Sequence, residues 1–299
     1  MNDDPGEVQV DVVVPLYNEE RNIQALCEAL RQQTRPFRVI LVDNGSTDQT
    51  VPLAQAYFSV YHCPEPGSYA ARNYGVRQGT APYVLFTDGD CTPDPHWVER
   101  MATEFDRGAD VVAGRALAAP RGALARTQIG RNLVTYFVEY ISRPSLSQDS
   151  QSITCLFPTC NVGYHRRVFE TLGEFPVEIG GDLTFSQRAA RKGFLCRICE
   201  QARVAHASET TEAGIAHKLF IYSVQFQVSP LQWIAALCLI LMLPLVAFIY
   251  FFIIYCCRSS KAKGIGIPLS HFALFETLHL MMVLFRIISK KFAPDKRIY

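Results

Sequence analysis

Short apolar runs alternate with amphipathic segments from Val8 to about Ile198. The apolar runs are rich in β-branched residues and end in turn residues, which is typical of buried strands. We predict strands at Val10–Val14, Arg38–Val42, Ser59–Cys63, Tyr83–Phe86 and Val111–Gly114, and a later strand that ends at Ile198.

The segments between these runs predict helices, and Asn22–Gln33 has apolar residues at the spacing of an amphipathic helix. Ser46 and Gln49 stand three residues apart, as in a capping box, and Asp94 precedes a proline, which is typical of a helix start. The polar stretch Gln148–Cys160 predicts a loop. We predict helices at Asn22–Gln33, Ser46–Tyr57, Ser68–Gln78, His96–Phe105 and Leu183–Lys192, and a further helix around Thr127–Ser142.

Repeated strand–helix units with short connections predict an α/β fold with a mostly parallel sheet and helices on both of its faces. In such sheets, ligands bind beyond the carboxyl ends of the strands. Polar residues stand at three of these ends: Tyr17-Asn18-Glu19, Asp43, and Asp88-Gly89-Asp90. This agreement between position and chemistry predicts a binding site at that edge of the sheet.

Composition narrows the class of protein. The 299 residues carry 29 Lys and Arg against 28 Asp and Glu, a net charge of +1, which argues against a nucleic-acid partner. A hydrophobic content of 49% excludes a disordered chain. The ten cysteines are scattered and no signal peptide is evident, so we expect reduced thiols in a cytosolic compartment.

Charge is absent from one long segment, because no Asp, Glu, Lys or Arg occurs between Lys218 and Arg258. Within it, Leu231–Tyr255 is long and apolar enough to cross a bilayer. A second apolar stretch, Leu269–Ser289, carries three polar residues on one helical face, so it is a second span or an interfacial helix. We therefore predict a globular domain over residues 1–228 and a membrane anchor over residues 229–299, whose basic tail favours the cytoplasmic side.

Five polar residues each have a structural and a functional interpretation. Asp88 and Asp90 form a solvated turn, or they share a divalent cation such as Mg²⁺ or Mn²⁺. Asp43 stabilises a turn or accepts hydrogen bonds from a nucleobase, and Arg72 is an exposed helix residue or pairs with a phosphate. Asp182 is a helix N-cap, or a general base that deprotonates an acceptor hydroxyl.

Cys196 and Cys199 have the spacing of zinc ligands, and His206 follows seven residues later. Structural zinc sites take four ligands, whereas this segment offers three. The two cysteines also lie on or next to a predicted strand, so we expect no zinc site there.

Five segments in order resemble the family 2 glycosyltransferases: VVVPLYNEERNI, VDNGSTDQT, ARNYG, FTDGDCTPDPHWVE and GEFPVEIGGDLTFSQRAARKGF. They cover roughly residues 8–206. The resemblance implies the GT-A fold, which is a Rossmann-like sheet with an acceptor-binding portion behind it. It also implies transfer of a sugar from a nucleotide-diphosphate donor, with inversion at the anomeric carbon.

The same resemblance implies donor-binding roles for residues that match the family's motifs. Pro15, Tyr17 and Glu19 would line the nucleotide pocket. Asp43 would contact the base, usually uracil, and Arg72 would lie near the nucleotide and its diphosphate.

The resemblance further implies metal and catalytic roles. Asp90 would be the main ligand of the Mg²⁺ or Mn²⁺ ion, with Asp88 on the ribose and metal side and His206 near the diphosphate as a further metal residue. Asp182 matches the aspartate of the family's Glu-Asp pair, which is the usual general base. This chain has Gly181 where the glutamate is common.

We interpret the chain as a membrane-anchored, inverting glycosyltransferase in the cell membrane, with its catalytic domain facing the cytoplasm. The donor would be a nucleotide-diphosphate sugar, in the simplest case a UDP-sugar, and the acceptor a lipid-linked or cell-envelope glycan. Two alternatives stay open. A nucleotidyltransferase would carry a glycine-rich loop after the first strand, where PLYNEERN stands instead. The second alternative is a catalytically degenerate membrane protein that only binds nucleotide sugars. Such a protein would not need all four aspartates, which are Asp43, Asp88, Asp90 and Asp182.

Overall fold

The computed structural model describes residues 8–119, 135, 138–139, 143–148, 153–178 and 180–207. All of them belong to the compact unit Met1–Ala216. In these ranges, no helix has both the length and the apolar character needed to cross a membrane. The two predicted membrane segments and the boundary at residue 228 lie outside the described residues, as does most of the predicted helix around Thr127–Ser142, so these stay predictions.

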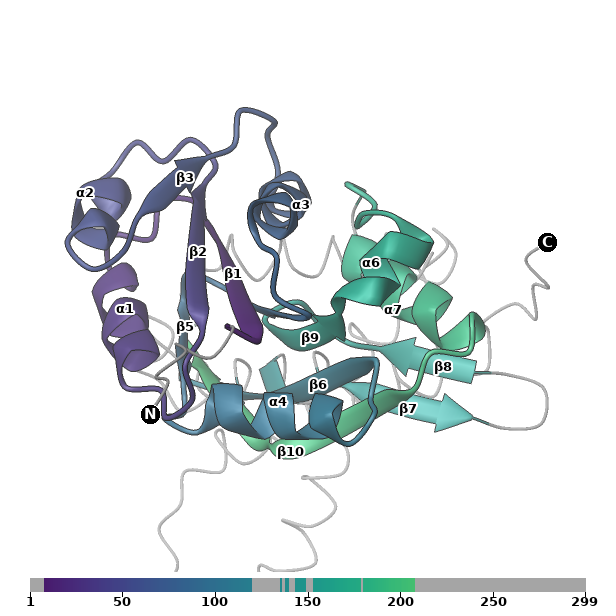
Figure 1. Cartoon of the computed structure of the whole chain (residues 1–299). Helices are drawn as coiled ribbons and strands as arrows, with labels where there is room; N and C mark the ends of the chain where they lie inside the picture. Colours follow the sequence, from purple (N-terminus) through teal and green to yellow (C-terminus); the bar gives the residue numbers. More distant parts are fainter. Residues whose placement is uncertain are drawn as a thin grey trace, which may run out of the picture. The chain divides into compact units, whose positions relative to one another are not determined.

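An eight-stranded sheet forms the centre of the domain (Figure 1). Its strands run in the order β3-β2-β1-β4-β9-β6-β10-β5. A separate hairpin pairs β7 (Ser145–Gln148) with β8 (Ile153–Leu156). The strands of the main sheet are β1 (Val10–Leu16), β2 (Arg38–Asp43), β3 (Val60–His62), β4 (Tyr83–Thr87), β5 (Cys91–Pro93), β6 (Val111–Ala118), β9 (Asn161–His165) and β10 (Cys196–His206).

The sheet is mixed, and four of its seven pairings are parallel. Strands β3, β2, β1 and β4 all run in the same direction. Strand β9 is antiparallel to both of its neighbours, β4 and β6, and β5 is antiparallel to β10. The α/β class and the mostly parallel sheet are therefore confirmed, although β9 and β5 interrupt the parallel order.

Helices cover both faces of the sheet, as predicted (Figure 1). The strands are buried on both sides, so alternate residues of β1 enter different cores, with Val12 in one and Val13 in the other. Helices α1 (Ile23–Arg31), α2 (Thr50–Gln55) and α4 (Trp97–Asp106) supply the first core, and α3 (Ser68–Gln78), α6 (Arg166–Leu172) and α7 (Gly181–Arg191) supply the second.

Four local predictions are wrong. Helix α4 begins at Trp97 with His96 at its N-cap, so Asp94 is no N-cap. Helix α2 begins at Thr50 without a side-chain cap, because the Ser46 hydroxyl accepts a hydrogen bond from the Asn18 backbone instead of closing a capping box. Helix α7 begins one residue before Asp182, with Gly180 at the N-cap in the left-handed region at φ 80°, so Asp182 is no N-cap. Part of the predicted loop Gln148–Cys160 is strand β8, which the hairpin pairing stabilises.

Asp11 makes a buried ionic link between β1, β2 and α6. Its side chain is fully buried and accepts hydrogen bonds from Arg38 Nε at 2.7 Å, Arg166 Nη2 at 2.8 Å and the Ala81 backbone N–H at 2.9 Å. These donors compensate the cost of removing a carboxylate from water. The link fixes the amino ends of the central strands, opposite the edge where the predicted site residues gather.

Candidate active site

The loops that follow β1 and β2 are hydrogen-bonded to each other. Asn18, in the left-handed region at φ 56°, donates from its backbone to Ser46 Oγ at 3.1 Å, and its side-chain oxygen accepts from the Thr47 backbone at 2.8 Å. The Glu19 backbone donates to Thr50 Oγ1 at 2.6 Å. These hydrogen bonds join the two loops into one rim, which carries parts of the motifs VVVPLYNEERNI and VDNGSTDQT. The sequence did not predict this rim.

Three residues of the predicted donor pocket lie on or below this rim. Tyr17 projects with 61% of its surface exposed, and Pro15 is half-buried at the end of β1. Asp43 is nearly buried, and its two carboxylate oxygens accept from the Gly45 and Ser46 backbones, both at 3.1 Å. The turn-stabilising role of Asp43 is thus present, and the role of all three in donor binding stays a prediction.

Glu19 lies against the Asp88-Gly89-Asp90 turn. A Cβ at Gly89 would lie 2.7 Å from Glu19 Cγ, so any larger residue there would force the Glu19 side chain to shift. Burial raises the pKa of Glu19 to about 7, and the Asp90 and Asp88 carboxylates act in the same direction, against the hydrogen bond from Asn22. Three carboxylates therefore gather at the ends of β1 and β4.

Asp90, Cys91 and His206 form a group with the chemistry of a metal site. His206 stands opposite Cys91 in the β5–β10 ladder, and the Ala207 backbone donates to the Asp90 carbonyl at 2.8 Å. His206 Nε2 and Cys91 Sγ each lie 3.6 Å from Asp90 Oδ1. One potential ligand atom from each of the three residues lies within 4.8 Å of the other two.

A carboxylate oxygen is a preferred ligand of Mn²⁺ and Mg²⁺, and the imidazole of histidine is a common metal ligand. Burial raises the pKa of the Cys91 thiol well above its usual range, with Asp90 adding to the effect. We therefore take Asp90 and His206 as the candidate ligands that fit the ion. Their pairing was predicted, whereas the position of Cys91 beside them was not.

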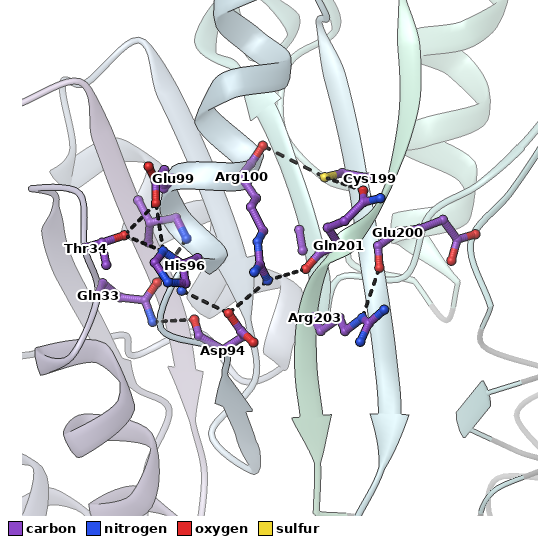
Figure 2. Close-up of polar contacts among 12 residues, drawn as sticks. Gln33, Thr34, Asp94, His96, Glu99, Arg100, Cys199, Glu200, Gln201 and Arg203 are labelled. Atoms are coloured by element: carbon purple, nitrogen blue, oxygen red, sulfur yellow. Dashed lines mark hydrogen bonds and ion pairs between the residues drawn. The ribbon is translucent and has the colours of Figure 1, made fainter.

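A network away from the site fixes β5 against β10 (Figure 2). Arg100 Nη1 donates to Asp94 Oδ1 at 2.9 Å and to the Gln201 carbonyl at 2.7 Å. The Asp94 backbone donates to the Arg203 carbonyl at 3.0 Å, next to the irregularity in β10 between Cys199 and Arg203. Because β5 and β10 carry Cys91 and His206, this network holds the two sides of the candidate metal site in register.

The ARNYG segment on α3 connects several parts of the site. Arg72 is buried, with 4% of its surface exposed, and its Nη2 forms an ion pair with Asp88 Oδ1. Asn73 exchanges two hydrogen bonds with the Phe175 backbone, at 2.9 and 3.0 Å. A Cβ at Gly75 would collide with Val13 on β1. Arg72 is therefore not an exposed helix residue, and in this structure it pairs with a carboxylate.

Asp182 lies in the first turn of α7 and accepts four hydrogen bonds. Oδ1 accepts from Tyr69 Oη at 2.7 Å and from the Leu183 backbone at 2.9 Å. Oδ2 accepts from the Thr159 backbone at 3.1 Å and from Thr159 Oγ1 at 3.4 Å. The sequence analysis assigned no role to Tyr69 or Thr159. Tyr69 lies in the first turn of α3, outside the ARNYG motif, and Thr159 lies in the stretch predicted as a loop.

Asp182 and Asp88 are linked through α3. The Arg72 guanidinium that pairs with Asp88 lies over the Tyr69 ring, 5.3 Å from its centre, and Tyr69 bonds to Asp182. Below them, aromatic rings from β4, β9, α6, α7 and the preceding loop pack with centres 4.6–6.1 Å apart, which fixes α7 against the sheet. The rings are Phe86, Tyr164, Phe169, Phe175 and Phe185.

Cys196 and Cys199 do not share a site. Cys196 belongs to the core that contains α7, whereas Cys199 belongs to the opposite core and contacts the Arg100 carbonyl at 3.9 Å. The irregularity in β10 begins at Cys199. The two thiols thus lie on opposite faces of the sheet, and the expectation that they do not form a zinc site agrees with this arrangement.

The sequence profile of the glycosyl transferase family 2 matches residues 11–173, more than half of the chain. The chain belongs to glycosyl transferase family 2. Among its curated relatives, the family 2 chain is 33% identical over 199 residues to the glycosyltransferase AglE of Haloferax volcanii, covering 62% of each protein. It is 32% identical over 121 residues to the undecaprenyl-phosphate 4-deoxy-4-formamido-L-arabinose transferase of Serratia proteamaculans, covering 35% of this chain and 36% of that protein.

This family 2 protein thus spans less than two thirds of the length of either relative. Among solved structures, it resembles S. aureus TarS 1-349 in complex with UDP-GlcNAc, with a TM-score of 0.54 and 22% identity over 70% of this chain and 61% of that one. It also resembles the mannosyltransferase PcManGT of Pyrobaculum calidifontis with GDP-Man and Mn²⁺, with a TM-score of 0.53 and 17% identity over 96% of this chain and 85% of that one. These likenesses support the GT-A-like fold.

Proposed function

We propose that the protein is a metal-dependent, inverting glycosyltransferase that moves a sugar from a nucleotide-diphosphate donor to an acceptor hydroxyl. The observation that carries this proposal is the chain of contacts from Asp88, two residues before the candidate metal ligand Asp90, to Asp182. Asp88 pairs with Arg72, which stacks on Tyr69, which in turn bonds to Asp182. A donor-binding half and a proton-accepting half are thus joined by a single helix.

In the donor half, Asp43 and the rim around Tyr17 would hold the nucleotide. The proposed base is uracil, for which Asp43 is the candidate hydrogen-bond acceptor. TarS was solved with UDP-GlcNAc and PcManGT with GDP-Man, so relatives of this fold accept more than one nucleotide sugar. Asp90 and His206 would hold Mn²⁺ or Mg²⁺, which when bound neutralises negative charge on a leaving diphosphate.

In the acceptor half, Asp182 would remove the proton of the acceptor hydroxyl. The acceptor oxygen forms its bond to the anomeric carbon as the bond to the diphosphate oxygen breaks, and the proton passes to the Asp182 carboxylate. Because attack and departure occur on opposite faces of the sugar, the configuration inverts. A single base and a stabilised leaving group are sufficient for such a displacement.

The acceptor would be a lipid-linked or cell-envelope glycan at the cytoplasmic face of the cell membrane. Three observations support this proposal: the uncharged interval between Lys218 and Arg258, its length, and the relative named an undecaprenyl-phosphate transferase. Full-length protein should remain with membranes through high-salt and carbonate washes, and a chain ending at Gln227 should not. A full-length protein that is soluble without detergent would contradict the anchor.

A donor panel tests the proposed activity. The full chain in detergent is heated with each common nucleotide sugar, with Mn²⁺ or with excess chelator, and release of the nucleoside diphosphate is measured. One class of nucleotide sugar should raise the melting temperature only with the metal present and should be consumed. If no nucleotide sugar stabilises the protein or is consumed with any acceptor lipid extract, the transferase proposal is wrong. The anomeric configuration of the product then tests inversion.

A further inference from the structure

Of the donors to Asp182 in the described part of the chain, Tyr69 is the closest. Its phenol oxygen lies 2.7 Å from Asp182 Oδ1, and it reaches across from the first turn of α3 to the first turn of α7. The Leu183 backbone bonds to the same oxygen at 2.9 Å, and both donors from Thr159 bond to the other oxygen. Each carboxylate oxygen is therefore fixed from two directions, and Tyr69 is the donor on the α3 side.

The Tyr69 ring is itself held in place. The Arg72 guanidinium lies 5.3 Å from the ring centre on one side, and the Phe175 ring centre lies 6.1 Å away. Arg72 cannot swing away freely, because it is buried and paired with Asp88. The phenol hydroxyl is thus presented to Asp182 by a fixed ring, which is the arrangement required of a group that orients another side chain.

Gly181 lies in the close contact between the start of α7, the Pro176 backbone and the Tyr69 ring. A Cβ at position 181 would collide with the Pro176 carbonyl oxygen and would stand 3.4 Å from Tyr69 Cδ2. The space beside Asp182 on this side is therefore occupied by the Tyr69 ring and the Pro176 backbone. The glycine that departs from the family's Glu-Asp pair and the tyrosine on α3 belong to the same packing arrangement.

We propose that Tyr69 is a positioning residue, which holds the Asp182 carboxylate in its reactive orientation through its phenol hydroxyl. This proposal rests on the proposed role of Asp182 as the base. Burial, together with the Asp182 charge, raises the pKa of Tyr69 far above its usual range, so the phenol remains a donor throughout the working pH range.

Among the residues that the structure describes, the groups around Asp182 that carry or could carry charge come from α3, β9 and the turn before β9. They are Tyr69 and Arg72 on α3, Cys160 in the turn before β9, and Tyr164 on β9. Burial raises the pKa of both Cys160 and Tyr164 well above their usual ranges, so neither ionises near neutral pH. A change in the pH dependence of turnover after removal of the Tyr69 hydroxyl therefore reports on its contact with Asp182.

The test is Tyr69→Phe in the full chain, which keeps the ring and its packing. Tyr83→Phe is the matched control, since Tyr83 also donates to a carboxylate, Asp106, at 3.2 Å, but stands at the opposite end of β4 from Asp88. A hydrogen bond to a charged group is strong enough that turnover should fall by about ten- to a hundredfold in Tyr69→Phe. Donor affinity should stay unchanged, and the acid limb of the turnover profile should move up by about one pH unit.

A double variant separates this role from a general effect on the fold. In the Asp182→Asn background, Tyr69→Phe should cost less than about threefold, because the group that it positions is already gone. Tyr69 would have no such role if its loss left turnover and the pH profile like those of Tyr83→Phe, or if it cost the same factor with and without Asp182. A wild-type protein without transferase activity would contradict the proposed function itself, and the role of Tyr69 with it.

Discussion

The two halves of the sheet are assembled differently. Strands β3, β2, β1 and β4 come from one continuous segment, pair with one another only in parallel, and are joined by short connections through α1, α2 and α3. Strands β9, β6, β10 and β5 come from segments up to about a hundred residues apart, and three of the four pairings that involve them, counting β4–β9, are antiparallel. Asp43, Glu19 and Asp88 lie in the first half, whereas His206 and Asp182 depend on the second.

This difference explains the division of chemistry. In the first half, the carboxyl ends of neighbouring parallel strands meet at one edge, so successive loops can converge on one ligand. In the second half, the functional residues are placed by long-range pairing: β5 against β10 for His206, and the α3–α7 contact for Asp182. We therefore expect donor binding to depend on the first half and the β5–β10 pairing, and proton removal to depend on the α3–α7 contact.

The largest effect is expected where the two halves meet, at Asp90. Asp90→Asn should reduce transfer by about 10³-fold or more, because a catalytic metal ion contributes several kcal/mol. Metal-dependent nucleotide binding should weaken in parallel, measured by titration with and without Mn²⁺. Asp106→Asn is the control, since Asp106 pairs with Arg35 on the surface. Full activity in excess chelator would contradict the metal role.

The next effect is on stability, at the buried ionic link between the halves. Asp11→Ala should lower the free energy of unfolding by about 3–5 kcal/mol, because it leaves Arg166 and the Ala81 backbone without their buried partner. Denaturant unfolding measures this change. Glu174→Ala removes an exposed ion pair with Arg77 and should cost less than about 1 kcal/mol. Equal costs for the two variants would show that Asp11 has no special role.

A smaller effect is expected at Gly114 in β6. A Cβ there would collide with the Ala202 carbonyl and would lie 2.5 Å from Asn161 Nδ2, so Gly114→Ala should destabilise the fold by roughly 1–3 kcal/mol. Because Ala202 belongs to the irregular part of β10, Mn²⁺ affinity should fall as well. Gly108 has a φ of 91° and open space where a Cβ would lie. Gly108→Ala is therefore a control that measures the cost of backbone strain without a steric clash. Unchanged Mn²⁺ affinity would separate β10 from the metal group.

The smallest effect is expected at the rim formed by the loops that follow β1 and β2. Ser46→Ala removes the acceptor for the Asn18 backbone, and one such hydrogen bond contributes about 0.5–1.5 kcal/mol. Nucleotide affinity should therefore weaken about two- to tenfold while turnover at saturating donor stays the same. Ser59→Ala, at an exposed position before β3, is the control. A loss of turnover without a loss of affinity would place Ser46 outside the donor rim.

The sequence predicted the first half of the sheet well because its signals are local. Strand β2 and helix α3 match their predicted ranges to within one residue, since a β-branched run followed by turn residues marks β2 and a glycine marks the end of α3. The sequence analysis did not predict β5 or β9. Strand β5 has only three residues, and β9 forms through pairing with strands that are distant in the sequence.

The site shows the same contrast. Asp90 and His206 were predicted together from the family's motifs, and the structure brings them within 3.6 Å. Tyr69, Thr159 and Cys91 could not be predicted, because nothing in the local pattern indicates which side chain lies opposite Asp182 or beside Asp90 after folding. The N-cap interpretation of Asp182 failed because Gly180, in the left-handed region, begins the helix earlier.

The central claim is that donor binding and proton removal reside in separate parts of this fold. The most direct measurement determines turnover and nucleotide-sugar affinity on one preparation of Asp182→Asn, with the melting temperature as control. General-base catalysis contributes about 10²–10⁴-fold, so turnover should fall by that factor while donor affinity stays within about twofold of wild type. Near-normal turnover with a normal melting temperature would contradict the account and move the search for the base to Glu178.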